Sequence, residues 1–265
     1  MKVAILYNQL SEGAAADEAD VLDQVELVEK NLCALGHSVE HLQINLNMQM
    51  LKNKLVDGKY DAVFNLSESI DNFGELITFG PALLDVTKIP YTGSSYEAIF
   101  LTTNKPVTKL LMRQFGIPTP QTISAKNIHE IDPSKRYIIK PIWEDGSLYL
   151  DEECVVYGNR LIEKLPDIDF RYFFIEQYIN GREFNISILT SPTGPQVLKP
   201  AEIVFENYLA DKPRIVGYAA KWNSDSFEYK NTVRRFPELN NILQNKLSQI
   251  CLDCWNSFKL KGYAR

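Results

Sequence analysis

Val3-Ala-Ile-Leu-Tyr7 is a short, continuous run of apolar residues near the start of the chain, and a helical pattern follows it. The run predicts a buried parallel strand, because such strands are covered on both faces. Residues 17–35 are predicted to form a helix that ends at Gly36, since apolar residues recur there at spacings of three and four. A buried strand followed by an amphipathic helix predicts an α/β unit.

The same alternation continues through the first hundred residues. Further strands are predicted at 38–44 and 62–66, and further helices at 48–56 and 74–86. Because strands and helices alternate, we expect an open α/β sheet.

The pattern changes after a helix predicted at 104–115, where Gly116-Ile-Pro-Thr-Pro120 interrupts the chain. The strands predicted beyond this point have few helices between them, which favours a mainly antiparallel architecture: 137–140, 173–178, 184–189 and 197–205. A final amphipathic helix is predicted at 237–258, starting at Pro237. The fold class is therefore α/β, with a parallel lobe followed by antiparallel lobes.

Composition and charge exclude several classes of function. The net charge is −6 and the Lys and Arg residues are dispersed, which argues against a general nucleic-acid surface. The chain has no run of about 20 apolar residues and no signal-peptide pattern, so we expect no membrane span and a cytoplasmic location.

Two lysines and two glutamates form the candidate ligand site. Lys140 ends the predicted strand Tyr137–Lys140, and Lys105 follows Thr102-Thr-Asn104 at the start of the helix predicted at 104–115. Glu176 and Glu183 lie on consecutive predicted strands separated by an Asn-Gly turn, which can bring both carboxylates to one side of a pocket. The alternatives are solvated lysines and a solvent-facing hairpin, and spacing alone favours these.

An ordered series of short motifs shifts this balance. Taken together, the series resembles the ATP-grasp ligases, and within them the D-alanine:D-alanine ligase family, in both order and spacing. It runs over essentially the whole chain: Ile89-Pro-Tyr-Thr-Gly-Ser94, Asn104-Lys105 with Thr108-Lys109, Gly116-Ile-Pro-Thr-Pro120, Ile138-Ile-Lys140-Pro141, Ile175-Glu176 with Gly181-Arg-Glu183-Phe-Asn185, Ala220-Lys221-Trp222, and Gly262-Tyr-Ala-Arg265.

The resemblance implies a domain organisation and a reaction. Residues 1–103 are expected to form an N-terminal Rossmann-like domain, 104–182 a central ATP-grasp subdomain, and 183–265 the start of a C-terminal ATP-grasp subdomain. The implied activity is ATP-dependent ligation of a carboxylate to an amine through an acyl phosphate, with ATP and small amino acids or peptides as substrates. No protein nucleophile is required, because catalysis depends on positioning and charge neutralisation.

The resemblance also implies roles around the base and ribose of ATP. Glu176, together with the backbone through Gln177, Tyr178 and Ile179, is expected to contact the adenine. Glu183 is expected to accept hydrogen bonds from the ribose hydroxyls.

Other residues are implied to act on the phosphates. Lys105, Lys140 and Lys221 are expected to bind ATP phosphates, and Ser147 lies in the expected phosphate lid. Arg265 matches the arginine that stabilises the acyl phosphate and the tetrahedral intermediate, a role that suits a fixed planar donor.

The chain departs from the family pattern in its metal ligands. The family binds two Mg²⁺ ions through an Asp and a Glu-x-Asn stretch, and we expect these ligands beyond Arg265; the polypeptide as given is then expected to be inactive or nearly so. Cys251 and Cys254 have the spacing of a metal-binding pair but lie in a predicted helix without a second pair. We therefore predict no metal ligand within the chain.

The expected lid is also altered. Gly146 and Ser147 match the family's serine- and glycine-rich loop, but Tyr149 stands where a glycine is expected. Because backbone cradling of phosphate uses conformations that favour glycine, a flexible loop without lid function is an open alternative.

The substrate end differs as well. Ser11-Glu12 is an uncertain match to the family's Ser-Ala-Glu element, and Asn65-Leu-Ser-Glu68 stands where a histidine is expected. Glu12, Asn65 and Glu68 are therefore candidate substrate-binding residues, while Asn65 and Glu68 have the equal alternative of capping a strand end. Rival hypotheses are a non-catalytic ATP-binding paralogue and a ligase for other amino acids or peptides; by family analogy, a homodimer through the N-terminal lobe is also an expectation.

Overall fold

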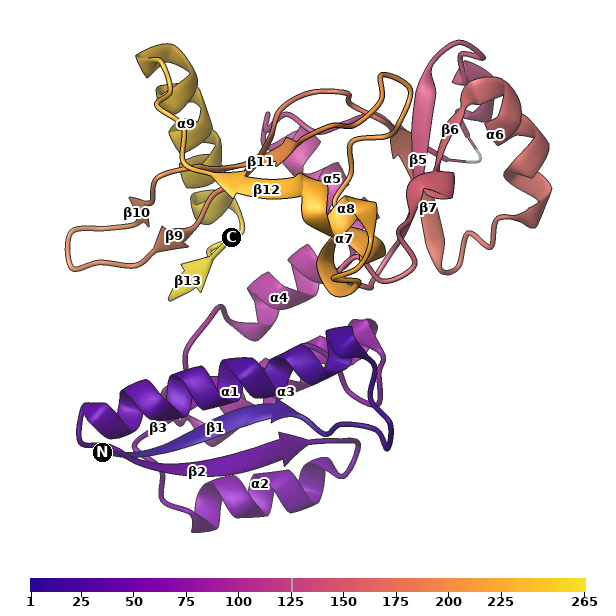
Figure 1. The fold of residues 1–265 in the computed structure, drawn as a ribbon. Coiled ribbons are helices and arrows are strands. Elements are labelled where there is room, and N and C mark those ends of the chain that lie inside the picture. The colour runs from indigo at the N-terminus through magenta and orange to yellow at the C-terminus, as the bar shows by residue number, and fades with distance from the viewer. Residues whose placement is uncertain (125) are drawn as a thin grey trace. The chain divides into compact units, whose positions relative to one another are not determined.

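A computed structural model describes residues 1–124 and 126–265. The chain divides into two compact units, each described here by itself (Figure 1). The first unit contains Met1–Thr103 and Phe258–Ala264, and the second contains Asn104–Ser257 and Arg265. The first unit is therefore assembled from two stretches of sequence.

The first unit has a parallel three-stranded sheet in the order β2-β1-β3. Helix α1 covers one face through Val21 and Val25, which pack on Ile5 and Tyr7. Helices α2 and α3 contribute to the core on the other face, and Figure 1 shows α1 and α2 on opposite sides of the sheet. The elements of this unit are β1 (Lys2–Asn8), α1 (Ala16–Ala34), β2 (Ser38–Ile44), α2 (Met48–Asp57), β3 (Ala62–Asn65), the 3₁₀ turn η1 (Gly74–Thr78), α3 (Phe79–Thr87), α4 (Tyr96–Thr103) and β13 (Tyr263–Ala264).

This arrangement confirms the predicted open α/β sheet. The helix predicted at 74–86 is divided, however, because residues 74–78 form a 3₁₀ turn before α3 begins. Helix α4 was not predicted; its residues carry little amphipathic pattern, and only Ala98 and Thr103 are buried.

The second unit has an antiparallel four-stranded sheet in the order β4-β7-β5-β6. One face of this sheet packs against Leu161 of helix α6. The elements up to this point are α5 (Lys105–Gln114), β4 (Thr122–Ile123), η2 (Ile128–Glu130), β5 (Arg136–Pro141), η3 (Glu152–Cys154), β6 (Val155–Tyr157), α6 (Gly158–Lys164), η4 (Leu165–Asp167) and β7 (Phe173–Gln177).

A second antiparallel sheet in this unit has the order β12-β11-β8, and β9 pairs with β10 as a separate hairpin. The predicted strand 184–189 is therefore two strands, because the chain leaves one pairing after Asn185 and begins another at Ile188. The remaining elements are β8 (Glu183–Asn185), β9 (Ile188–Leu189), β10 (Gln196–Val197), β11 (Ala201–Phe205), α7 (Tyr218–Trp222), α8 (Phe227–Asn231), β12 (Thr232–Arg235) and α9 (Asn241–Ser257).

Two other predicted boundaries are wrong for local reasons. The predicted strand 197–205 is interrupted before β11, where Pro200 has no N–H for a ladder hydrogen bond. Helix α9 begins at Asn241 rather than Pro237, because the side chain of Asn240 accepts a hydrogen bond from the backbone N–H of Leu243 at 2.9 Å and caps the first turn.

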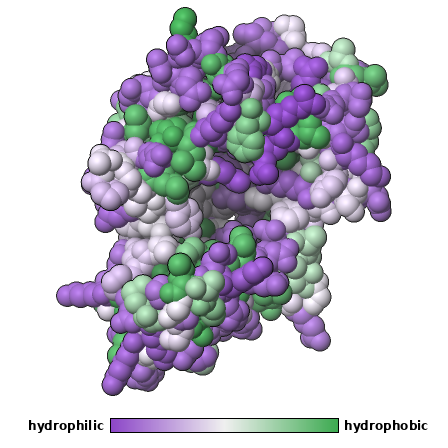
Figure 2. Space-filling model, turned by 60° about the vertical axis from the view of Figure 1, so that its left-hand side comes forward, coloured by the Kyte–Doolittle hydropathy of each residue, from purple (hydrophilic) through white to green (hydrophobic). Residues whose placement is uncertain are grey.

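The visible surface of both units is mainly hydrophilic, with hydrophobic residues in small groups (Figure 2). Among residues 1–124 and 126–265, no helix combines the length and apolar character needed to cross a bilayer.

Candidate functional site

The candidate site lies on the face of the four-stranded sheet opposite helix α6. Ile138 pairs with Glu176, and Lys140 pairs with Phe174, across strands β5 and β7. Because side chains alternate along a strand, Ile138, Lys140 and Glu176 share one face, and Lys140 is the diagonal neighbour of Glu176. This register places a lysine and a glutamate together on an otherwise apolar face.

Glu176 is the most deeply buried charged residue of this site, with 2% of its surface exposed. Lys140 Nζ lies 2.7 Å from its Oε1, and Lys109 Nζ lies 2.5 Å from its Oε2. The second distance is short, yet no hydrogen bond of normal direction reaches the buried Oε2 from the residues that the structure describes. One carboxylate is thus held between two ammonium groups.

Burial affects the protonation of two further groups. The pKa of Lys109 is lowered because burial disfavours its charged form, although the nearby Glu176 opposes this shift. The pKa of Glu183 is raised by burial, and the charges of Lys140 and Lys221 oppose that shift. The site therefore contains partly desolvated charges of both signs.

Lys140, Glu176 and Glu183 line an open pocket of about 160 Å³. Its lining is Pro120, Ile138, Lys140, Glu176, Gln177, Tyr178, Ile179, Glu183, Arg214 and Ile215. Six of the residues predicted from the sequence, Lys140, the run 176–179 and Glu183, are among them. The lining does not include Lys105, Ser147 or Lys221.

The solvent-facing hairpin expected as an alternative is wrong. Strand β7 pairs with β4 and β5, whereas β8 pairs with β11, so Glu176 and Glu183 belong to different sheets. Both carboxylates nevertheless line the same pocket. The Asn-Gly turn connects two sheets instead of closing a hairpin.

Tyr178 fastens the segment that carries Arg214 and Ile215 to the sheet. Its hydroxyl accepts a hydrogen bond from the Arg214 N–H at 2.8 Å and donates one to the Arg214 carbonyl at 3.3 Å. Arg136 lies 4.7 Å from the centre of the Tyr178 ring, and its guanidinium donates to the Asp211 carbonyl at 3.1 Å. Tyr178 and Arg136 therefore hold residues 211–215, of which Arg214 and Ile215 form a wall of the pocket.

Lys105 is the first residue of helix α5, which Asn104 caps by accepting a hydrogen bond from the Val107 N–H. The ammonium group donates to the Glu144 carbonyl at 2.7 Å and lies 3.1 Å from an oxygen of Asp145. Lys105 thus contacts the loop that follows β5, which is the loop predicted as a phosphate lid.

That loop is attached to the segment around helix α7. The Ser147 hydroxyl donates to the Val216 carbonyl at 2.6 Å, and the Trp222 indole N–H donates to the Gly146 carbonyl at 2.9 Å. Tyr149 has φ of 57°, a conformation that favours glycine. A tyrosine therefore occupies a backbone conformation typical of glycine here, and its ring packs edge-on against Phe173.

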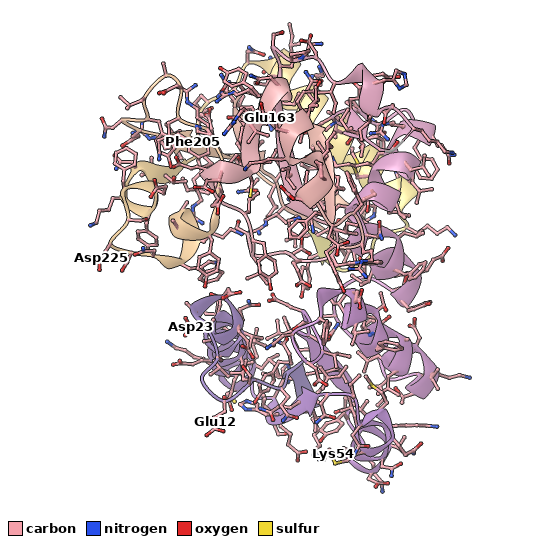
Figure 3. All side chains as sticks on the ribbon, turned by 90° about the vertical axis from the view of Figure 1, so that its right-hand side faces the viewer. Glu12, Asp23, Lys54, Glu163, Phe205 and Asp225 are labelled. Atoms are coloured by element: carbon pink, nitrogen blue, oxygen red, sulfur yellow. The ribbon has the colours of Figure 1, made fainter. Side chains whose placement is uncertain are left out.

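The predicted substrate residues lie in the first unit. Glu12 is exposed in the loop between β1 and α1 (Figure 3), where Ser11 donates to Glu18 rather than to Glu12. Asn65, at the end of β3, accepts hydrogen bonds from the Ser67 N–H and hydroxyl. This is the geometry of a turn cap.

Glu68 follows the same strand end. Its N–H donates to the Asn8 side chain at 3.1 Å, and its exposed carboxylate accepts from Gln24 at 3.3 Å. Asn65 and Glu68 therefore lie close to the carboxyl ends of β1 and β3, the edge at which open α/β sheets bind ligands.

Two other predicted residues have different positions in the second unit. Lys221 lies on α7, near enough to affect the pKa of Glu183. Arg265 is exposed. Within the described part of the chain, no group of three or more His, Cys, Asp or Glu side chains is placed to hold a metal ion.

Sequence reasoning missed Lys109, Arg214 and Ile215 as parts of the site. Lys109 had two available signals: it belongs to the motif Thr108-Lys109 quoted above, and it follows Lys105 by four residues and so shares its helix face. The other two lie outside regular structure, and no local pattern identified them.

The chain resembles known proteins in its sequence. No family model matches the chain. It is 30% identical over 232 residues to the D-alanine–D-alanine ligase of Pseudothermotoga lettingae, covering 86% of this chain and 72% of that protein. It is 27% identical over 274 residues to the D-alanine–D-alanine ligase of Aquifex aeolicus, covering 100% of this chain and 84% of that protein.

The fold has a solved counterpart. The structure of D-alanine–D-alanine ligase from Bacillus anthracis complexed with ATP matches with a TM-score of 0.71 and 20% identity, covering 99% of this chain and 79% of that chain. At this identity the match concerns the fold.

Proposed function

Because the chain belongs to the D-alanine–D-alanine ligase family of ATP-grasp proteins, we propose that it is an ATP-dependent ligase that joins a carboxylate to an amine. One observation carries the assignment of the site: Lys140, Glu176 and Glu183 line a single pocket together with the strand end 177–179. This set offers a cation for phosphate, acceptors for an amino group and hydroxyls, and backbone groups for a base edge.

We assign the nucleotide contacts accordingly. Glu176 and the backbone of Gln177, Tyr178 and Ile179 bind the adenine, and Glu183 accepts hydrogen bonds from the ribose hydroxyls. Glu183 suits this role because it is partly buried, which strengthens its hydrogen bonds by excluding water.

The phosphates are assigned to Lys140, Lys105 and Lys221, with Ser147 in the loop that covers them. Lys105 contacts this loop at the Glu144 carbonyl and at the Asp145 carboxylate. A phosphate that binds Lys105 would therefore replace one anionic partner, Asp145, with another. The hydrogen bond from Ser147 to the Val216 carbonyl favours an ordered lid, as opposed to a flexible loop without lid function.

The proposed reaction has two steps. A carboxylate oxygen of the first substrate attacks the γ-phosphorus, the bond to the β-phosphate oxygen breaks, and ADP leaves. The amine nitrogen of the second substrate then attacks the acyl carbon, phosphate leaves, and the nitrogen loses a proton as the amide forms. Arg265 is assigned to the negative charge of the acyl phosphate and the tetrahedral intermediate.

The family uses Mg²⁺ with ATP, but the described residues do not form a carboxylate-based site for it. We therefore derive no step through a metal ion. The lysines account for the charge neutralisation that this chain itself supplies.

Amino acids or short peptides are the proposed substrates, and a pair of D-alanines for peptidoglycan synthesis is the first case to test. Asn65 and Glu68 replace the expected histidine region, and we assign them, with Glu12, to the substrate end. Dependence on ATP fits a cytoplasmic enzyme, and a homodimer stays an expectation from the family.

Two measurements test the proposal. Phosphate release with ATP is measured for D-alanine, other amino acids and dipeptides, and the amide product is identified by mass spectrometry. Calorimetry compares ATP binding by the wild type with Lys140→Ala and Glu183→Ala, and exposed Lys246→Ala is the control. Each site variant is expected to weaken binding about tenfold or more, since charge-assisted hydrogen bonds are lost. Unchanged affinity in both site variants would reject the assignment.

A further inference from the structure

Lys109 is a largely buried lysine that the proposed reaction does not use. Its side chain is 16% exposed, and its ammonium group lies 2.5 Å from Glu176 Oε2 and donates to the Thr119 hydroxyl at 3.1 Å. A lysine is rarely placed in such a position, because burial penalises its charge. We therefore expect Lys109 to have a specific role at Glu176.

The two oxygens of Glu176 have different surroundings. Oε2 is fully buried and is approached by Lys109 from helix α5, whereas Oε1 is approached by Lys140 from the pocket side. An ionised carboxylate has about four acceptor positions. With Lys109 at Oε2, the acceptor positions of Oε1 are shared between Lys140 and a donor that enters the pocket.

Charges on every neighbouring element contribute to this arrangement. Arg113 lies on α5 with Lys109, and both Arg113 and Lys140 disfavour the charge of Lys109. Glu183, from β8, is in turn influenced by Lys140 and Lys221. Glu176 is the group that draws Lys109 and Lys140 together, so losing either contact changes where its carboxylate points.

We propose that Lys109 is a positioning residue that holds Oε2 of Glu176 at the buried end of the pocket, so that Oε1 faces the nucleotide base and sets a preference for adenine over guanine. This inference rests on the proposed function. Adenine carries an amino donor where guanine carries a carbonyl acceptor. A fixed carboxylate oxygen accepts a hydrogen bond from the adenine amino group and repels the guanine carbonyl. The preference for adenine is therefore lower when the carboxylate of Glu176 can turn.

The test measures base selectivity, the ratio of the dissociation constants of GTP and ATP, by calorimetry on the full chain. Lys109→Met is expected to lower this ratio about tenfold, because the hydrogen bond from the adenine amino group to the charged Oε1 of Glu176 is lost. Lys109→Arg keeps a cation near Oε2 and is expected to retain most of the selectivity. Lys246→Met, an exposed lysine in the same unit, is the control.

A double-mutant cycle separates positioning from general stabilisation. Glu176→Gln is expected to lose selectivity, and adding Lys109→Met to it is expected to change the ratio no further, because Lys109 acts through Glu176. The double variant removes both buried charges, so it also serves if Lys109→Met alone does not fold. A further fall in selectivity in the double variant, or full selectivity in folded Lys109→Met, overturns the inference.

Failure of the proposed function and failure of the role of Lys109 give different results. A wild-type protein that binds neither nucleotide rejects the ATP site and the inference together. A wild type that prefers ATP, with selectivity unchanged in Lys109→Met, rejects only the role of Lys109.

Discussion

Replacing Tyr178 by Phe isolates the hydroxyl that fastens one wall of the pocket. The variant loses the two hydrogen bonds to the Arg214 backbone. It keeps the ring, and hence the contact with the Arg136 guanidinium that lies 4.7 Å from the ring centre. The change therefore removes polar contacts while leaving the packing of this 8% exposed side chain in place.

The expected cost follows from these contacts. Two hydrogen bonds at about 1 kcal/mol each give about 2 kcal/mol for local opening of residues 211–217, or roughly a 30-fold larger opening constant. Ile215 lines the pocket, so ATP affinity is expected to fall as well, because the binding-competent wall is populated less.

Hydrogen exchange measured by mass spectrometry checks this prediction. Peptides covering 211–218 are expected to exchange faster in Tyr178→Phe, whereas peptides from the first unit are expected to be unchanged. Tyr157→Phe is the matched control, because that tyrosine is 53% exposed. Equal exchange rates in the variant and the wild type would show that the hydroxyl does not hold the wall, and the reasoning would be refuted.

Two further changes have defined outcomes. Burial raises the pKa of Glu183, so its contribution to stability is greatest below the ordinary carboxyl value of 4.5 and is lost as the pH rises through the raised pKa. Glu183→Gln should therefore melt at a higher temperature than the wild type at pH 8 but not at pH 4. If the variant and the wild type melt at the same temperature at both pH values, this prediction is contradicted. Trp222→Phe removes the indole hydrogen bond to the Gly146 carbonyl, and at a cost of about 1 kcal/mol the loop 143–150 should be cut several-fold faster in limited proteolysis. An unchanged rate would mean that other contacts hold the loop.

The parallel sheet could be predicted from sequence because its signals are local. Strands β1 and β3 are short, mainly apolar runs, and α1 has a clear helical repeat through Val21 and Val25, both of which are buried. Helix α4 lacks such a repeat and was missed. The predicted start of α9 at Pro237 was wrong, because the side chain of Asn240 caps the helix further along the chain.

The antiparallel part depended on pairings that the sequence does not display. Nothing local shows that β8 pairs with β11 instead of β7, so the hairpin alternative was reasonable and wrong. The candidate site was found only because the order of the motifs resembled a family. The ATP-binding roles and the division of residues 104–265 at 183 stay predictions.

Two features of the second unit depend on tertiary contacts that the sequence pattern does not show. Lys109 is largely buried and contacts Glu176 of strand β7, a contact that a helix pattern cannot reveal. Tyr149 adopts a conformation typical of glycine, and its ring packs on Phe173. Such strain is tolerated when surrounding contacts fix it, so residue type alone does not determine the backbone conformation at this position.

The first unit closes with residues from the far end of the chain. Ser94 exchanges hydrogen bonds with the backbone of Lys261, and Gly262 lies so close to Gly93 that an added Cβ would meet the Gly93 nitrogen at 2.9 Å. During synthesis on the ribosome, the sheet of this unit can emerge and pair long before residues 258–264 are translated. Its completion must therefore wait until the whole of 104–257 has been made, and a fragment ending at Thr103 lacks a piece of its own domain.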